Sequence, residues 1–188
     1  AIKEAFFGGR SLFRKLIYPL HESKYLEIIK NELVDNYFFV PLQTYTDFQI
    51  LEHSGYRSIE KFIIEVLESF SKNNLEIWLV FKHHPVDRGR KDYKSFIINQ
   101  AELLGIEDRV LVLYDTHLPT LLKNAKGTVT INSTVGLSSI YHETPTITLG
   151  NAIYDIEGLT CQGMKLDDFW HEYQAPDMEL LDKYRSYI

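Results

Sequence analysis

The chain has 188 residues, a length that fits one domain, and its 45% hydrophobic and 24% charged residues are ordinary for a globular protein. Its formal net charge of −6 argues against sequence-blind nucleic-acid binding, which needs a basic surface. A single cysteine, Cys161, excludes an intrachain disulfide and a cysteine-based zinc site, and it agrees with a reducing cytosol. No apolar run approaches the roughly 18 residues that span a membrane, and no signal peptide is visible.

Strand-like apolar runs alternate with amphipathic stretches along the chain. In chain order we predict a helix at 24–33, a strand at 37–42, a helix at 59–70, a strand at 76–81, a helix at 93–104, a strand at 109–114, a helix at 118–123, a strand at 127–131, a helix at 135–142, a strand at 145–149 and helices at 166–173 and 178–188. Most strands are continuously apolar, as in sheets covered on both faces. The order predicts an α/β fold: a doubly wound, mostly parallel, Rossmann-like sheet of about five or six strands, with C-terminal helices.

In such sheets, ligands bind beyond the carboxyl ends of the strands. The segments that follow the predicted strands hold the polar chemistry of this chain. Four of its seven histidines lie there, namely His53, His83, His84 and His117. We therefore expect the functional site at this edge, and we interpret Trp78 and Trp170 as packing residues.

Lys82-His83-His84-Pro85 follows the second predicted strand. The tetrapeptide places a cation and an imidazole at the sheet edge, and Pro85 fixes the backbone after the histidine. Such a pair suits a phosphate or carboxylate oxygen, with lysine as a point charge and histidine as a directed donor. A solvated basic turn is an equally good interpretation of the tetrapeptide alone.

Asn132-Ser133-Thr134 follows the fourth predicted strand and opens a helix. Serine and threonine are usual helix caps, so a plain N-cap is one interpretation. The other is an anion site, because a helix start presents free N–H groups and the positive end of the helix dipole. Both interpretations hold together without conflict.

The segment after the first predicted strand contains Gln43, Asp47 and His53. A carboxylate that faces an anion pocket is usually present for chemistry or to hold hydroxyl groups. As a nucleophile, Asp47 would attack an anomeric carbon, as carboxylates do in retaining glycosidases. The alternative, which the segment alone favours, is that Asp47 caps the next helix or pins the loop. After the last strand, glycines permit close backbone approach to a ligand, and Tyr154 is a candidate to stack on a base or sugar ring.

Taken in this order, these segments resemble the capsule polysaccharide biosynthesis proteins of the Kps type, which are bacterial transferases of 3-deoxy-manno-octulosonic acid (Kdo). The likeness covers roughly residues 37–160. The matching motifs are Gln43…Asp47…His53-Ser54, Lys82-x-His84-Pro85, His117-Leu118-Pro119-Thr120-Leu121-Leu122, Asn132-Ser133-Thr134-Val135-Gly136-Leu137 through Gly150, and Tyr154-Asp155…Gly158-Leu159-Thr160. The ordered set is far more specific than any one member.

The resemblance implies a GT-B-type glycosyltransferase that uses CMP-Kdo as donor substrate, with no metal and no other cofactor. It implies Asp47 as nucleophile, with Gln43 in the same catalytic motif. For the nucleotide and its phosphate it implies Lys82, His84, Pro85, Asn132, Ser133 and Thr134, and for the substrate His53, His117 and Tyr154.

GT-B enzymes have two Rossmann-like domains, so the resemblance implies that residues 1–188 are a single nucleotide-sugar-binding domain, the C-terminal half. The acceptor domain would precede Ala1, and we expect the isolated chain to bind nucleotide but to transfer sugar poorly or not at all. The implied acceptor is a glycolipid or oligosaccharide, in the cytoplasm, with peripheral association at the inner face of the inner membrane left open. The alternatives are a CMP-sialic acid transferase, a CDP-polyol phosphotransferase, or a non-catalytic α/β module that binds a phosphorylated ligand or a partner protein.

Overall fold

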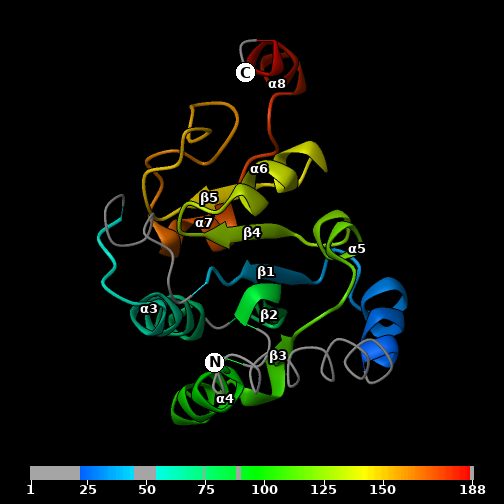
Figure 1. Cartoon of the computed structure of the whole chain (residues 1–188), viewed down its shortest axis with the longest axis vertical. Coiled ribbons are helices and arrows are strands. Elements are labelled where there is room, and N and C mark those ends of the chain that lie inside the picture. The colour runs from blue at the N-terminus through cyan, green and yellow to red at the C-terminus, as the bar shows by residue number, and fades with distance from the viewer. Residues whose placement is uncertain (1–21, 45–53, 74, 88–89, 187–188) are drawn as a thin grey trace, which may run out of the picture.

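The computed structural model describes residues 22–44, 54–73, 75–87 and 90–186. Its centre is a five-stranded sheet in the order β3-β2-β1-β4-β5, and every neighbouring pair is parallel. Figure 1 shows the strands stacked from β3 at the bottom to β5 near the top. The strands are β1 (Tyr37–Pro41), β2 (Trp78–Lys82), β3 (Val110–Leu113), β4 (Gly127–Thr130) and β5 (Thr146–Thr148).

Helices connect the strands, as parallel pairing requires. A helix at 22–31 precedes β1. The others, with two short 3₁₀ turns, are α3 (Ile59–Lys72), η1 (Pro85–Asp87), α4 (Lys94–Leu103), η2 (Glu107–Arg109), α5 (Leu118–Lys123), α6 (Thr134–Tyr141), α7 (Leu166–Glu172) and α8 (Met178–Arg185). None of the described helices is long and apolar enough to cross a bilayer.

The strands are buried on both faces, and alternate residues of β1 divide between two cores. Phe38 and Val40 belong to the core beneath α3, α4 and α7. Tyr37 and Phe39 belong to the core beneath helix 22–31 and α5. This division explains why β1 is apolar throughout and confirms the predicted doubly wound arrangement.

Helix α6 lies on the same face as α5. Ser139 of α6 donates a 2.7 Å hydrogen bond to the hydroxyl of Thr128 in β4. The next residue, Val129, points the other way, into the core beneath α3 and α7. Because side chains alternate along a strand, α6 and Val80 of β2 share one face of the sheet.

The C-terminal helices complete the domain as predicted. Trp170 of α7 is 2% exposed and donates a 2.8 Å hydrogen bond from its indole N–H to the hydroxyl of Ser69 in α3. Its ring meets Phe38 and Phe70 edge-on. Trp78 is partly buried against the other core, so both tryptophans pack against a core.

Candidate functional site

The strand order reverses direction at one point in the sheet. From β1 the chain builds outward through β2 to β3, and it then returns to the other side of β1 to form β4 and β5. The helices that follow β1 and β4, α3 and α6, therefore lie on opposite faces of the sheet, and the point between the two strand ends is the usual ligand site of this architecture. The residues at this point are Gln43 after β1 and Asn132 after β4.

Gln43 and Asn132 are joined at this point by two hydrogen bonds. The Gln43 side-chain amide donates to Asn132 Oδ1 at 2.9 Å, and the Asn132 backbone N–H donates to Gln43 Oε1 at 3.2 Å. Gln43 is 4% exposed, so its amide is largely covered by protein. This arrangement holds the two loops together, and the catalytic role expected of Gln43 stays a prediction.

Helix α6 begins immediately after Asn132. Ser133 is its N-cap, and Ser133 Oγ accepts from the backbone N–H of Val135 at 3.2 Å. The cap uses the serine oxygen as an acceptor, so its O–H is still able to donate. Thr134, the first helical residue, is exposed. The helix start thus combines a positive dipole end with two hydroxyl groups, which is the arrangement that binds anions.

Tyr154, from the loop after β5, packs against the start of α6 and holds it in place. It is 2% exposed, and its hydroxyl donates to the backbone carbonyl of Ser133. Burial, and then the charge of Asp155, raise the pKa of Tyr154, which keeps the hydroxyl protonated as a donor. A ring this covered offers no face for a base or sugar, so the stacking role expected of Tyr154 is corrected to a supporting one.

Gly136 is the residue of α6 that allows Tyr154 to approach. A Cβ at Gly136 would overlap the tyrosine hydroxyl and lie only 2.8 Å from Cζ. We expect Gly136→Ala to lower the free energy of unfolding by about 1–3 kcal/mol, the usual range for overpacking. Thermal or denaturant unfolding measures this change. Gly55→Ala is the matched control, because no heavy atom lies within 4 Å of its added Cβ. Equal stability of both variants would contradict the packing described for Tyr154.

Lys82 and His84 lie at the end of β2, on the other side of β1 from α6. Lys82 is 8% exposed, and its ammonium group donates to the His83 carbonyl at 3.4 Å. By alternation from Val80, its side chain starts on the face that carries α6. The strand order thus brings this cation and the α6 N-terminus to one edge and one face, with β1 between them.

His84 is held in one tautomer by its own turn. The backbone N–H of Val86 donates to His84 Nδ1 at 3.1 Å, so the proton of the neutral ring lies on Nε2, which acts as a donor. Pro85 opens the 3₁₀ turn that supplies this bond. The Lys82–Pro85 segment therefore presents the Lys82 ammonium group and the His84 Nε2–H from defined backbone positions.

Of the remaining predicted site residues, His117 lies in a described loop, whereas Asp47 and His53 do not. His117 is exposed at the N-cap of α5, with its Nδ1 3.0 Å from the Thr120 hydroxyl. Asp47 and His53 lie outside the described residues. Ser54, just after that segment, pairs with Gly150 beyond β5 in an isolated bridge.

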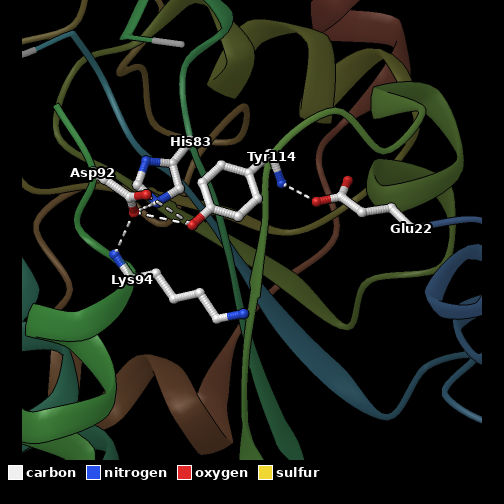
Figure 2. A network of polar contacts seen from close by, with 5 residues as sticks. All are labelled: Glu22, His83, Asp92, Lys94 and Tyr114. Atoms are coloured by element: carbon white, nitrogen blue, oxygen red, sulfur yellow. Dashed lines mark hydrogen bonds and ion pairs between the residues drawn. The ribbon is translucent and has the colours of Figure 1, made fainter. Parts of the chain in front are cut away.

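A polar network around the buried His83, next to β2, was missed by the sequence interpretation (Figure 2). His83 is 4% exposed and stacks on Tyr114, with ring centroids 4.6 Å apart and an interplanar angle of 9°. Asp92 accepts from the Tyr114 hydroxyl at 3.0 Å and from the Lys94 backbone N–H at 3.0 Å, and it lies 3.6 Å from His83 Nε2.

Glu22 fixes the loop after β3 from the opposite side. Its carboxylate is 5% exposed and accepts from the backbone N–H groups of Tyr114 and Asp115 and from the Thr116 hydroxyl, at 2.6, 2.8 and 2.7 Å. Three donors satisfy this buried charge. The sequence did contain a signal for the position of His83. Side chains alternate along β2, and Phe81 lies in the core beneath α4, so position 83 is directed toward the same core.

Metal ligation has no visible basis in the described part of the chain. There, no three histidine, cysteine or acidic side chains are grouped as a metal site requires. The groups at the ends of β2, β1 and β4 are amides, hydroxyls, a lysine and a histidine. These groups match the oxygens of an anion.

The fold and this edge define the class: a Rossmann-like α/β domain with its polar groups at the topological switch point. The chain belongs to the family described as "Capsule polysaccharide biosynthesis protein", which matches residues 8–188.

Two relatives resemble almost the whole chain. It is 43% identical over 180 residues to the capsule polysaccharide export protein KpsS of Escherichia coli, covering 95% of this chain and 46% of that protein. It is 38% identical over 182 residues to the capsule polysaccharide modification protein LipB of Neisseria meningitidis, covering 94% of this chain and 42% of that protein. The chain therefore spans less than half the length of these relatives.

A solved structure resembles the fold. KpsC of Thermosulfurimonas dismutans, described as a beta Kdo 2,7 transferase, matches with a TM-score of 0.51 and 17% identity, over 86% of this chain and 52% of that one. At this identity the likeness supports the fold alone.

Proposed function

We propose that this chain is the donor-binding domain of a capsule glycosyltransferase that takes Kdo from CMP-Kdo. The observation that carries the proposal is the convergence of the β2, β1 and β4 ends on one edge, with Lys82 and His84 on one side of β1 and the α6 N-terminus on the other. Cations, a histidine N–H and helix N–H groups are the partners that a phosphate oxygen prefers. Family membership and the fold of KpsC agree with the proposal.

In the proposed reaction, the Asp47 carboxylate attacks the anomeric carbon of Kdo. The bond from that carbon to the phosphate oxygen breaks, and CMP departs with the electron pair. Lys82 and His84 offset the charge that develops on the departing phosphate. An acceptor hydroxyl then displaces the carboxylate and loses its proton, so the sugar keeps its original anomeric configuration.

The acceptor belongs to the proposal for the whole protein. We propose a lipid-linked or saccharide acceptor, held by a second domain of the longer protein, in the cytoplasm at the inner face of the inner membrane. The isolated chain then binds CMP but transfers sugar poorly or not at all. Robust Kdo transfer by residues 1–188 alone would overturn this division of labour.

Donor competition distinguishes this proposal from its enzymatic alternatives. We expect calorimetric titration of the protein to give tighter binding for CMP-Kdo than for CMP-sialic acid or CDP-glycerol. CMP-Kdo and CMP-sialic acid carry the same CMP phosphate, so the comparison between them tests the sugar. CDP-glycerol carries a second phosphate and a polyol in place of the sugar, so it tests the phosphotransferase alternative. Tighter binding of CDP-glycerol would indicate a polyol phosphotransferase, and tighter binding of CMP-sialic acid would indicate a sialyltransferase.

A further inference from the structure

A stack of three aromatic rings holds the end of β2 on the face of the sheet opposite α6. The His83 imidazole lies between Tyr114, 4.6 Å away at 9°, and Tyr93, 5.9 Å away at 22°. Tyr93 is 1% exposed and His83 is 4% exposed, so the middle of the stack is closed to solvent. Rings in these arrangements attract one another by roughly 0.5–1.5 kcal/mol beyond their area burial.

Both outer rings of this stack are fixed independently. Tyr93 belongs to the hydrophobic core beneath α4. Tyr114 is held at its backbone N–H by Glu22 and at its hydroxyl by Asp92. Figure 2 shows the imidazole and the phenol ring facing each other, with Asp92 at the edge of both. His83 therefore has little rotational freedom.

The position of His83 in the chain connects this stack to the donor site. His83 and Lys82 are consecutive and leave the strand on opposite faces, His83 toward the α4 core and Lys82 toward the face of α6. The His83 backbone is bonded on both sides: its N–H donates to Leu113 O at 2.8 Å, and its carbonyl accepts from Lys82 Nζ at 3.4 Å. A fixed imidazole at 83 thus fixes the backbone from which Lys82 and His84 project.

We propose that His83 is a positioning residue of the donor site: its imidazole, clamped between Tyr93 and Tyr114, preorganises the Lys82–His84 segment for the donor phosphate. This inference rests on the proposed function and adds a role for a residue outside the ligand's reach. Preorganisation matters because a displacement of about 1 Å in a positioned group costs up to 100-fold in catalysis.

The test uses the full-length protein with CMP as the titrant. We expect His83→Leu, which removes the flat ring, to weaken CMP binding about tenfold. We expect His83→Phe, which keeps a flat ring between the tyrosines, to restore affinity to within about threefold of the wild type. The comparison variant is His142→Leu, at the exposed C-cap of α6, with wild-type affinity expected.

Unfolding midpoints and steady-state kinetics separate positioning from general destabilisation. A positioning role predicts that the affinity loss persists at temperatures far below the midpoint and that KM for CMP-Kdo rises. Should His83→Leu fail to fold, Tyr114→Ala removes one stacking partner and keeps the backbone bond to Glu22, and we expect a similar loss. Wild-type affinity in a folded His83→Leu or Tyr114→Ala protein overturns the inference.

Two further variants keep this inference distinguishable from the proposed function. If Lys82→Ala and His84→Ala weaken CMP binding while His83→Leu and Tyr114→Ala do not, the positioning role of His83 is wrong and the proposed function stands. If neither pair affects CMP binding, the assignment of the donor phosphate to this segment is wrong as well.

Discussion

Replacement of Asp47 by alanine in the full-length protein is expected to abolish Kdo transfer while CMP still binds. Loss of a nucleophile removes the covalent route, and such losses in other enzymes reduce kcat by 10⁴-fold or more. The CMP phosphate is assigned to other groups, so its affinity should change little. Initial rates of transfer from CMP-Kdo, with calorimetry for CMP, measure the two effects separately.

Asp108→Ala is the matched control for this variant. Asp108 is exposed in the short turn before β3, at the opposite edge of the sheet, and we expect wild-type transfer from it. An Asp47→Ala protein that transfers Kdo at the wild-type rate would favour a non-catalytic phospholigand-binding module. It would also return Asp47 to the loop-pinning interpretation.

Replacement of His84 by alanine is expected to weaken CMP binding by about 10- to 100-fold. The ring donates from Nε2, because Val86 occupies Nδ1, and a hydrogen bond to a charged oxygen contributes roughly 1.5–3 kcal/mol. Isothermal titration of the variant with CMP measures the loss. His142→Ala, at the C-cap of α6 on the remote edge, provides a control with expected wild-type affinity.

Unchanged CMP affinity in His84→Ala would remove the histidine from the site. Because Lys82 is buried two positions before His84, Lys82→Met belongs in the same series. That variant keeps the apolar stem and removes the ammonium group. A loss of CMP affinity in Lys82→Met but not in His84→Ala would place the phosphate nearer β1 and further from the 3₁₀ turn.

The fold could be predicted because local and global signals agree in this chain. The five apolar runs became the five strands, and the predicted helix at 118–123 matches α5 (Leu118–Lys123). Ser58 marks the start of α3 and accepts from the Lys61 N–H at 3.4 Å, as a helix N-cap does. Burial on both faces left a nearly continuous apolar signal in β1, β2 and β3, and this signal is hard to mistake for a surface loop.

The pairing of site residues could not be predicted, because it joins positions that are distant along the chain. Gln43 and Asn132 are 89 positions apart, and nothing in either motif indicates that their amides bond to each other. Glu22 and Thr116 are 94 positions apart, and their contact depends on how helix 22–31 packs. Sequence motifs identified the edge of the sheet, and tertiary packing decided which side chains hold others in place.

Tyr154 shows the limit of reasoning from residue type. A tyrosine in a glycine-containing loop at a ligand edge fits a stacking platform and a buried support equally well. The structure decides for support, because Gly136 leaves the space that the ring fills. His83 is the opposite case, since alternation along β2 would have directed it toward the α4 core.

The most direct test of the central claim is a crystal structure of the protein with CMP bound. We predict that the phosphate lies within about 3 Å of His84 Nε2 and of N–H groups in the first turn of α6, above the Gln43–Asn132 pair. A phosphate bound elsewhere, for example in the cleft between Lys72 of α3 and Lys165 before α7, would contradict the account.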